Sequence, residues 1–478
     1  MIKNNNQQME LNRTMKGRHL FMISLGGIIG TGLFLGSGYT VSQAGPIGAI
    51  LAYLVGGLIM YLTMLCLGEL SVAMPVAGSF QVYTSRFISP AIGFTVGWNY
   101  WLGWAVTIAL ELLSAGVLMK RWFPDSPVWM WCLIFGSALF LVNMLSTRTF
   151  AETEFWFASI KVSAIVLFVI LGGAAMFGLI DMKDGQEAPL FSNFTTSGLL
   201  PNGVTGFLMT MITVSFAFQG TELIGIAAGE SEDPEKNIPK SIRAIVWRTL
   251  FFYVLAIFVL SGIIPSSEAG VIQSPFVVVF DKIGIPYASD IMNFVILTAL
   301  LSVANSGVYA STRMLWSLSQ DNMAVSKLGK LNKKGVPMNA LLLTMSISSL
   351  SLLSGLVAEN TVFLWLISTA GLGTIVSWIA ITASQIAFRK QYLAKGGTLE
   401  ELKFKTPLYP YLPLLALLLN LTVLVSLGFD PDQRMGLYCS IPFMVICYLY
   451  YKLRIERKKE ALQKDNLNDS IEKINEIS

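Results

Sequence analysis

A glycine-rich stretch interrupts the first apolar segment of the chain and constrains the fold more than any other feature. It runs from residue 24 to residue 38 and reads SLGGIIGTGLFLGSG, so six of its fifteen residues are glycine. Each glycine costs about 1 kcal/mol relative to alanine in a helix interior. Backbone groups exposed by a break cannot face lipid, but they can line a polar cavity. The stretch therefore predicts a broken helix at a binding site, with a glycine-rich packing face as the alternative.

A second interrupted segment favours the broken-helix interpretation. Residues 215–230 read SFAFQGTELIGIAAGE, and Gly220-Thr221-Glu222 there corresponds to Gly30-Thr31-Gly32 in the first segment. Paired breaks in corresponding positions of two halves indicate an inverted repeat with its binding site near the middle of the membrane. No strong sequence identity joins the halves, so the predicted repeat depends on the paired breaks.

The composition is that of an integral membrane protein, because 54% of the residues are hydrophobic and only 13% are charged, against about 25% charged in soluble domains. Twelve apolar runs have the roughly 20 residues that a transmembrane helix needs. They are 18–38, 47–72, 93–119, 127–146, 155–178, 205–229, 241–264, 288–317, 338–357, 361–387, 409–429 and 435–453. We expect an all-α fold with twelve transmembrane helices: a five-plus-five inverted repeat with broken helices 1 and 6, and two additional C-terminal helices.

The distribution of lysine and arginine predicts the orientation. Of the 33 such residues, Lys161 falls within the membrane and five fall in outer loops, namely Lys120, Arg121, Lys183, Lys282 and Arg434. The remaining 27 are on the inner side, so the positive-inside rule places both termini in the cytoplasm of a multi-pass plasma-membrane protein. The expected units are a cytoplasmic segment 1–17, repeats at 18–178 and 205–387, helices 11 and 12 at 409–453, and a cytoplasmic tail 454–478. The outer loop 265–287 is expected to cover the mouth of a cavity.

Nothing in the sequence indicates an enzyme. The four cysteines, Cys66, Cys132, Cys439 and Cys447, lie in apolar segments without ligand spacing, which predicts neither disulfides nor a metal site. The single histidine, His19, is expected at the membrane interface. Because the chain also lacks a phosphate loop and a catalytic triad, we expect no cofactor and no nucleic-acid partner.

Five charged residues at membrane depth are functional candidates, because inserting a charge there costs about 2.5–3.5 kcal/mol or more, and three of them are expected at the substrate or proton site. Lys161 either extends toward the cytoplasmic surface or is a buried ammonium group that can carry a proton. Glu111 needs a proton or a cationic partner, which is either a substrate side chain or another helix residue such as Lys161. Glu222 directly follows the second break, where a carboxylate suits a cation or a proton. Lys161 and Glu222 could form a proton relay or a structural pair.

Three further residues are expected to act at gates or in secondary positions. Glu69 and Glu230 lie toward the cytoplasmic ends of the second and sixth segments, where a gate or interface role is expected rather than substrate binding. Asn305 lies in the eighth segment, in the small polar sequence SVANSG, which is typical of close helix packing with hydrogen bonds.

Several motifs together resemble a known family. GGIIGTGLF at residues 26–34 is similar to the first-segment motif of bacterial amino-acid permeases in the amino acid–polyamine–organocation superfamily. Residues 68–75, 218–230 and 305–307 match the same family in the expected order, over roughly residues 12–455. The chain looks most similar to the basic amino-acid permeases for arginine, ornithine and lysine.

The resemblance implies roles for matching positions. Backbone amides of Gly30, Thr31 and Gly32 would hold the substrate carboxylate, and carbonyls of Ile28, Phe216 and Gln219, beside Gly220, would hold its α-ammonium group. Lys161 matches the proton-linked lysine of the family, and Glu222 matches a carboxylate beside the break. Glu111 as the partner of the substrate side chain is a physical inference added to the resemblance.

The predicted function is therefore import of a cationic amino acid by proton symport in an alternating-access cycle, with the amino acid, protons and the bilayer as partners. An S-methylmethionine or other amino-acid permease and an arginine/ornithine exchanger remain open. An amino-acid sensor is the alternative from another class, although no long soluble domain is present. The oligomeric state is left open.

Overall fold

The computed structural model describes residues 26–457, with gaps at 77, 145–146, 197, 271–272, 333–334 and 432. Over this part of the chain the secondary structure is helical, and it contains no strand. The expected segment 1–17, His19 and the tail beyond residue 457 lie outside the described residues.

The long helices follow the apolar runs of the sequence. They are α3 (Gly36–Ala73), α5 (Pro90–Met119), α7 (Thr147–Met176), α11 (Pro234–Ile263), α13 (Ala288–Gln320), α15 (Glu359–Ala394), and α14 (Met338–Ser348), α16 (Tyr411–Ser426) and α17 (Met435–Tyr450). Each of the last three is lengthened by a further helical turn, to Gly355, Phe429 and Glu456. Nine helical spans of the described part are long and apolar enough to cross a membrane. Two shorter apolar helices, α6 (Val128–Asn143) and α9 (Gly203–Ala217), occupy two further runs.

The boundary between the first two expected segments differs from the prediction. The range of α3 contains two helical parts, the end of the first run and the whole second run, and the expected loop 39–46 is shortened to a break at Gly45 between them. A kink replaces the loop, because Gly45 adopts a φ of 76° and Pro46 follows it. Proline lacks the amide that would continue the helical hydrogen bonds, so the chain leaves helical geometry and changes direction at this point.

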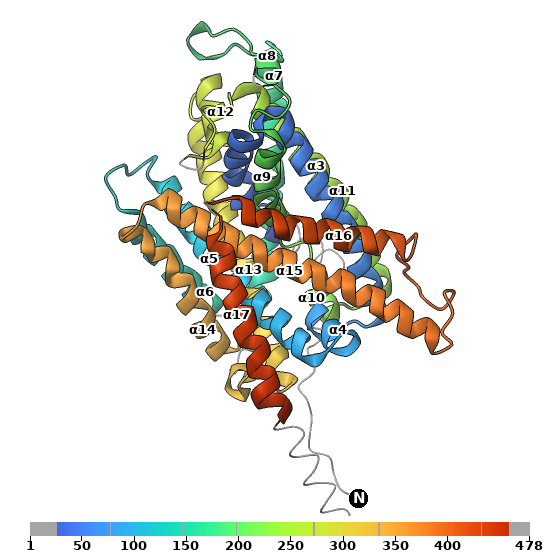
Figure 1. Cartoon of the computed structure of the whole chain (residues 1–478). Coiled ribbons are helices and arrows are strands. Elements are labelled where there is room, and N and C mark those ends of the chain that lie inside the picture. Colours follow the sequence, from blue (N-terminus) through green and yellow to red (C-terminus); the bar gives the residue numbers. More distant parts are fainter. Residues whose placement is uncertain are drawn as a thin grey trace, which may run out of the picture.

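Helix α5 lies at the centre of the molecule. It packs against α13 and α15, while α3 packs against α9 and α11. Figure 1 shows α5 and α13 enclosed by neighbouring helices, with α6 and α14 on one side and α3 and α11 on the other. Most of α5 is buried, whereas α16 and α17 expose large apolar side chains such as Leu418, Val425 and Ile446. Such an apolar outer surface suits lipid, because lipid tails are as apolar as leucine.

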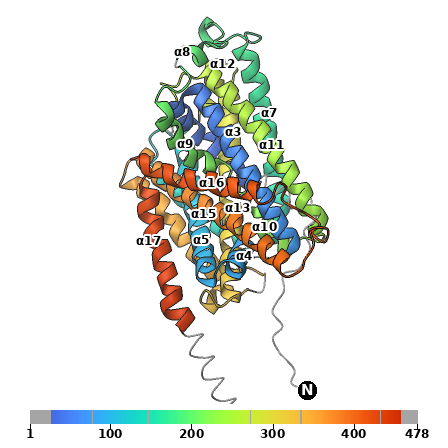
Figure 2. The ribbon, with the colours of Figure 1, turned by 45° about the vertical axis from the view of Figure 1, so that its right-hand side comes forward.

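Short helices lie at the two ends of the bundle. Figure 2, which turns the molecule by 45°, shows α8 (Ser192–Thr196) and α12 (Pro275–Ile283) at one end. The same view shows α4 (Phe80–Phe87) and the end of α17 at the other end. The predicted outer loops and the predicted inner segments therefore lie at opposite ends of the molecule.

Both predicted helix breaks are present. Helix α2 (Thr31–Phe34) starts after a non-helical Gly30 with φ −148° and ψ −148°. In the second segment, α9 ends at Ala217 and α10 (Leu223–Ala227) begins after five intervening residues. The residues between them include Gly220, whose φ of 99° is in the region that favours glycine.

Helix α2 approaches α9 so closely that only glycine fits between them. A Cβ atom added at Gly32 would lie 2.5 Å from the Cα atom of Ala217. Because backbone cannot move aside as a flexible side chain can, we expect Gly32→Ala to destabilise the fold by about 1–3 kcal/mol. The melting temperature of the purified protein should fall measurably.

Gly428→Ala is the matched control, since nothing lies within 4 Å of a Cβ added there. Equal melting temperatures for the two variants would contradict the close approach of α2 and α9.

Candidate functional site

The two helix breaks contact each other. A Cβ atom added at Gly220 would lie 2.7 Å from the carbonyl oxygen of Gly27 and 3.2 Å from the amide nitrogen of Ile28. The absence of a side chain at Gly220 thus lets the two interrupted backbones touch. Segments almost two hundred residues apart in the chain therefore form one site of exposed backbone groups.

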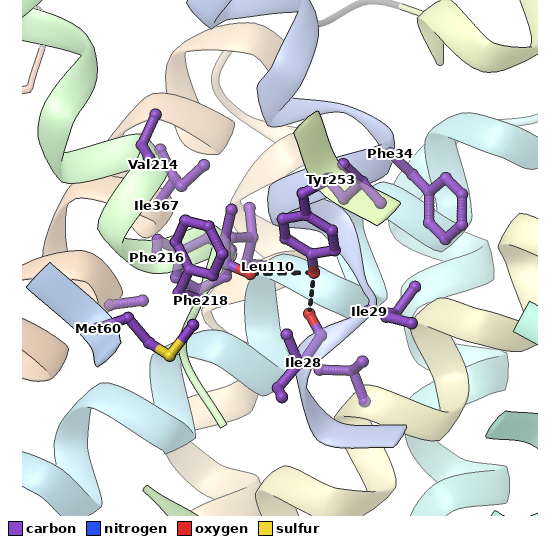
Figure 3. Close-up of a cluster of buried hydrophobic side chains, with 14 of the residues drawn as sticks. Ile28, Ile29, Phe34, Met60, Leu110, Val214, Phe216, Phe218, Tyr253 and Ile367 are labelled. Carbon is purple, nitrogen blue, oxygen red and sulfur yellow. Dashed lines mark hydrogen bonds between the residues drawn. The ribbon is translucent and has the colours of Figure 1, made fainter. Parts of the chain in front are cut away.

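Two buried tyrosines bind backbone carbonyls at the breaks. The Tyr253 hydroxyl of α11 lies 3.0 Å from the carbonyl oxygen of Ile28 and 3.1 Å from that of Ala217. Figure 3 shows Tyr253 between these two oxygens, surrounded by apolar side chains such as Phe216 and Phe218. The Tyr53 hydroxyl of α3 donates to the carbonyl of Gly32 over 3.2 Å. Neither tyrosine is predicted from the sequence, where the only signal is a polar tip inside an apolar run.

Glu111 of α5 binds the start of α2. Its carboxylate accepts hydrogen bonds from the Thr31 backbone amide at 3.2 Å and 3.3 Å and from the Thr31 hydroxyl at 2.7 Å. The first amides of a helix have no intrahelical acceptor and attract an anion. Gly30 leaves room for this carboxylate, because a Cβ there would lie 2.8 Å from Oε1 of Glu111. Glu111 is itself 1% exposed.

A small cavity lies between the two breaks and α5. Its lining consists of Gly27, Ile28, Gly30, Gly32, Trp104, Thr107, Glu111, Phe216, Gln219 and Val303. The cavity volume is about 10 Å³, which is about the space that one water molecule needs. Six of the eight residues predicted to bind substrate line this one cavity: Ile28, Gly30, Gly32, Glu111, Phe216 and Gln219. The site is thus assembled, but it is closed around too little space for an amino acid.

Hydrogen bonds also hold the second break. Both oxygens of Glu222 accept from the Gly220 amide, at 3.2 Å and 3.1 Å, and Oε1 lies 3.3 Å from the Tyr100 hydroxyl of α5. The Thr107 hydroxyl, also from α5, contacts Oε1 of Gln219 over 3.1 Å. Helix α5 thus contacts the second break through two side chains and the first break through Glu111.

Lys161 of α7 binds the start of the first break. Its ammonium group donates a 2.6 Å hydrogen bond to the carbonyl oxygen of Gly26. The side chain is 0% exposed, so the alternative that Lys161 extends to the cytoplasmic surface is wrong. Together, Lys161 and Glu111 place one positive and one negative side chain on the same short stretch of interrupted backbone.

Glu69 belongs to a buried ion pair at the inner end of α3. Nε of Arg389 on α15 donates to its carboxylate over 2.6 Å, and the Nη2 atom of Arg389 contacts the second oxygen. Gln385 at 2.9 Å and the backbone amide of Thr406 at 2.7 Å complete the set. Asn305 of α13 lies elsewhere and accepts a 2.8 Å hydrogen bond from Asn143 of α6. The side chain of Glu230 is outside the described residues.

The described residues of the loop at 265–287 contact the end of α2, which follows the first break. The Ser274 hydroxyl donates to the carbonyl of Phe34 over 2.8 Å, and the rings of Phe34 and Phe276 lie 5.0 Å apart. Arg121, after α5, binds Asp281 of α12 and Asp290 of α13. Burial raises the pKa of Asp281, but the hydrogen bonds from Arg121 and Ser289 hold that pKa below its ordinary value. Arg121 therefore connects α12, which lies in this loop, to α5 and α13 of the helix bundle.

The described residues contain no group of three or more His, Cys, Asp or Glu side chains that could hold a metal ion. What they do form is a membrane-embedded cavity between two broken helices, with backbone amides, backbone carbonyls and buried charges around it. This arrangement is that of a secondary transporter.

The comparison with known proteins identifies the family. Residues 19–464 match the model of the amino acid permease family, so the chain belongs to that family and is a multi-pass membrane protein. The chain is 61% identical to the amino-acid permease RocE of Bacillus subtilis over 96% of its length and 99% of the relative. It is 57% identical to a putative histidine permease of the same organism, with 98% and 99% covered.

More distant relatives extend the likeness. The lysine-specific permease LysP of Escherichia coli is 43% identical over 93% of this chain and 94% of the relative. Among solved structures, a manganese transporter of Eremococcus coleocola superposes with a TM-score of 0.56 over 94% of this chain and 99% of that one. At 14% identity, the last likeness shows the transporter fold alone.

We expect Tyr253→Phe to destabilise the protein by about 1–3 kcal/mol, because two buried carbonyl oxygens lose the single hydroxyl proton that they share, which the membrane interior cannot replace. The melting temperature of the purified variant measures this loss. Tyr438→Phe is the control, since Tyr438 is 66% exposed on α17. A Tyr253→Phe protein as stable as the control would show that the hydroxyl is dispensable at the breaks.

We expect Glu69→Gln to lower stability by about 3–5 kcal/mol, because it leaves the buried Arg389 charge uncompensated. Glu235→Gln is the matched control: its partner Lys403 is 62% exposed, and surface pairs contribute about 0–1 kcal/mol. Thermal unfolding of both variants makes the comparison. Similar melting temperatures would argue that the Glu69 pair is solvated and free to open.

Proposed function

We propose that this permease imports a cationic amino acid of the arginine, ornithine or lysine type across the plasma membrane by proton symport. The observation that carries the proposal is the buried Glu111 carboxylate, which lines the same cavity as both helix breaks. A carboxylate without water is stabilised by a cation, and the substrate side group supplies one. The likeness to a lysine-specific permease also supports a substrate with a positively charged side group.

The proposed membrane arrangement has twelve transmembrane helices, built as a five-plus-five inverted repeat with two additional helices. The contact between the breaks at Gly27 and Gly220 supports it, because corresponding broken helices meet at the substrate site in such repeats. The excess of lysine and arginine on one side supports cytoplasmic termini.

The proposed substrate contacts are backbone groups at the breaks. Amides at Gly30, Thr31 and Gly32 hold the carboxylate of the amino acid, and carbonyls at Ile28, Phe216 and Gln219, with Gly220 beside them, hold its α-ammonium group. Of these carbonyls, that of Ile28 contacts Tyr253 and that of Phe216 accepts from the Gln219 amide over 2.9 Å. Since a carbonyl oxygen has two lone pairs, an ammonium group can add to these bonds as the cavity opens.

Proton coupling is assigned to Lys161 and Glu222. A charged Lys161 holds the Gly26 carbonyl at the first break more strongly than a neutral amine does, because charge-assisted hydrogen bonds are about twice as strong. Loss of its proton therefore loosens the first break, while Glu222 acts on the second break through Gly220. Glu69 with Arg389, Glu230 and Asn305 are assigned to gating or secondary positions.

Uptake of arginine into proteoliposomes tests the function. With the membrane voltage clamped, we expect an inward proton gradient to drive accumulation of radiolabelled arginine, and unlabelled lysine and ornithine to compete. Glu111→Gln should abolish arginine uptake, and Lys161→Ala should abolish the response to the proton gradient. Glu235→Gln, on the surface, should behave like the unmodified protein.

Other outcomes of the uptake experiment would change the proposed substrate or the proposed mechanism. Competition by histidine rather than lysine would favour the substrate named for the 57% identical relative. Competition by S-methylmethionine or leucine alone would reopen the substrate class. Uptake that ignores the proton gradient but requires internal ornithine would replace symport by exchange.

A further inference from the structure

Glu111 lies where the proposed function puts the carboxylate of the substrate. The Thr31 amide and hydroxyl are the donors assigned to that carboxylate, and both donate to Glu111 in the closed site, over 3.2 Å and 2.7 Å. Glu111 and an amino acid present the same chemical group, so they compete for the same donors. A carboxylate of the protein thus substitutes for the carboxylate of the ligand.

We propose that Glu111 is an internal occupant of the substrate-carboxylate site and that binding exchanges one carboxylate for the other. The incoming amino acid takes the donors of Thr31, and the displaced Glu111 pairs with the positive side group of the same molecule. The inference rests on the proposed function for the identity of the substrate and adds a selection step to it.

The cavity is too small to hold the Glu111 carboxylate and the substrate carboxylate at the same time. The cavity volume is about 10 Å³, whereas pockets for small ligands measure about 300–1,000 Å³. A Cβ atom placed on Gly30 would lie only 2.8 Å from Oε1 of Glu111 and 2.8 Å from the Cγ2 atom of Val303. The carboxylate thus fills the room that Gly30 provides, and a second carboxylate cannot reach the Thr31 amide until Glu111 leaves.

Trp104 indicates independently that this closed cavity is a ligand site. Its indole lines the cavity, is 0% exposed, and its Nε1 atom has no hydrogen-bond partner among the described residues. A buried donor without an acceptor costs about 1–3 kcal/mol. Trp104, Thr107 and Glu111 lie on the same face of α5, since they are separated by three and four positions. The Tyr100 hydroxyl is the polar group that interacts with the Trp104 side chain in the closed site, and a bound amino acid along this face would give the indole N–H a full acceptor.

The exchange explains how the site selects a cation. When a neutral amino acid displaces Glu111, the carboxylate loses its donors and remains buried without compensation, which is strongly unfavourable. When a cationic amino acid displaces it, the side group supplies the missing partner. Selectivity then arises because the Glu111 carboxylate needs a partner in both states. Thr31 is its partner in the closed site, and the positive side group of the substrate is its partner in the complex.

Titration calorimetry on the full-length protein in nanodiscs tests the exchange with three probes. Arginine has both the carboxylate and the positive side group. Citrulline is its isostere with a neutral side group, and agmatine is arginine without the carboxylate. For the unmodified protein we expect arginine to bind, citrulline to bind weakly, and agmatine not to displace Glu111. In Glu111→Gln and in Glu111→Ala, citrulline should bind about tenfold or more tightly than before, while arginine weakens, because no charged group remains to be displaced.

Tighter binding of citrulline by the Glu111 variants distinguishes the carboxylate exchange from its alternatives. If Glu111 only contacts the substrate side chain, both variants lose arginine and leave citrulline unchanged. If Glu111 only caps the backbone at Thr31, both variants weaken arginine and citrulline together. Either result overturns the proposal, and Glu235→Gln serves as the control with unchanged affinities.

Infrared difference spectra give a readout that does not depend on affinity. With arginine labelled by ¹³C at its carboxylate, binding should shift an unlabelled carboxylate stretch that is missing in Glu111→Gln. An unshifted band on binding overturns the exchange. If the protein binds a neutral amino acid and ignores arginine, the proposed substrate fails; the exchange is then tested with that amino acid, which must bind more tightly to Glu111→Gln.

Discussion

The structure depends on satisfying interrupted backbone in a place without water. Each break at α2 and between α9 and α10 exposes amides and carbonyls that lipid cannot bind. The protein supplies partners from four other helices: Tyr53 from α3, Glu111 from α5, Lys161 from α7 and Tyr253 from α11. The breaks are therefore held by side chains, and the surrounding helices take part in the site as well as enclosing it.

The closed cavity and the charges around it are connected by the same requirement. Lys161 binds a carbonyl at the start of the first break, Glu111 binds an amide at the start of α2, and Glu222 binds an amide at the second break. Each buried charge is matched to a backbone group of suitable polarity. A substrate amino acid carries the same two backbone-binding groups, an ammonium and a carboxylate, and so can replace protein groups one for one. On the proposed function, the site would exchange these partners during transport while each buried charge keeps a partner.

Much of the fold could be predicted from the chain itself. Apolar runs of about 20 residues correspond to helices, because a bilayer demands that length, and both glycine-rich interruptions occur as predicted. The break between the first two segments lies at Gly45, inside the predicted interval 39–46, but it is a kink before Pro46 and shorter than the expected loop. Ile28, Gly30, Phe216 and Gln219, named from the family resemblance, line one cavity together with Glu111, named from its charge at membrane depth, and their roles in binding stay predictions.

The sequence alone determined where charge and backbone interruption enter the membrane, since insertion cost and helix propensity act on local composition. It could not determine what those groups contact. The tyrosines at the carbonyls, the choice of Thr31 as the partner of Glu111, and Arg389 as the partner of Glu69 all join residues far apart in the chain. Only the packing of helices decides such pairs, because hydrogen bonds require atoms within about 3 Å, and that distance is a property of the tertiary structure.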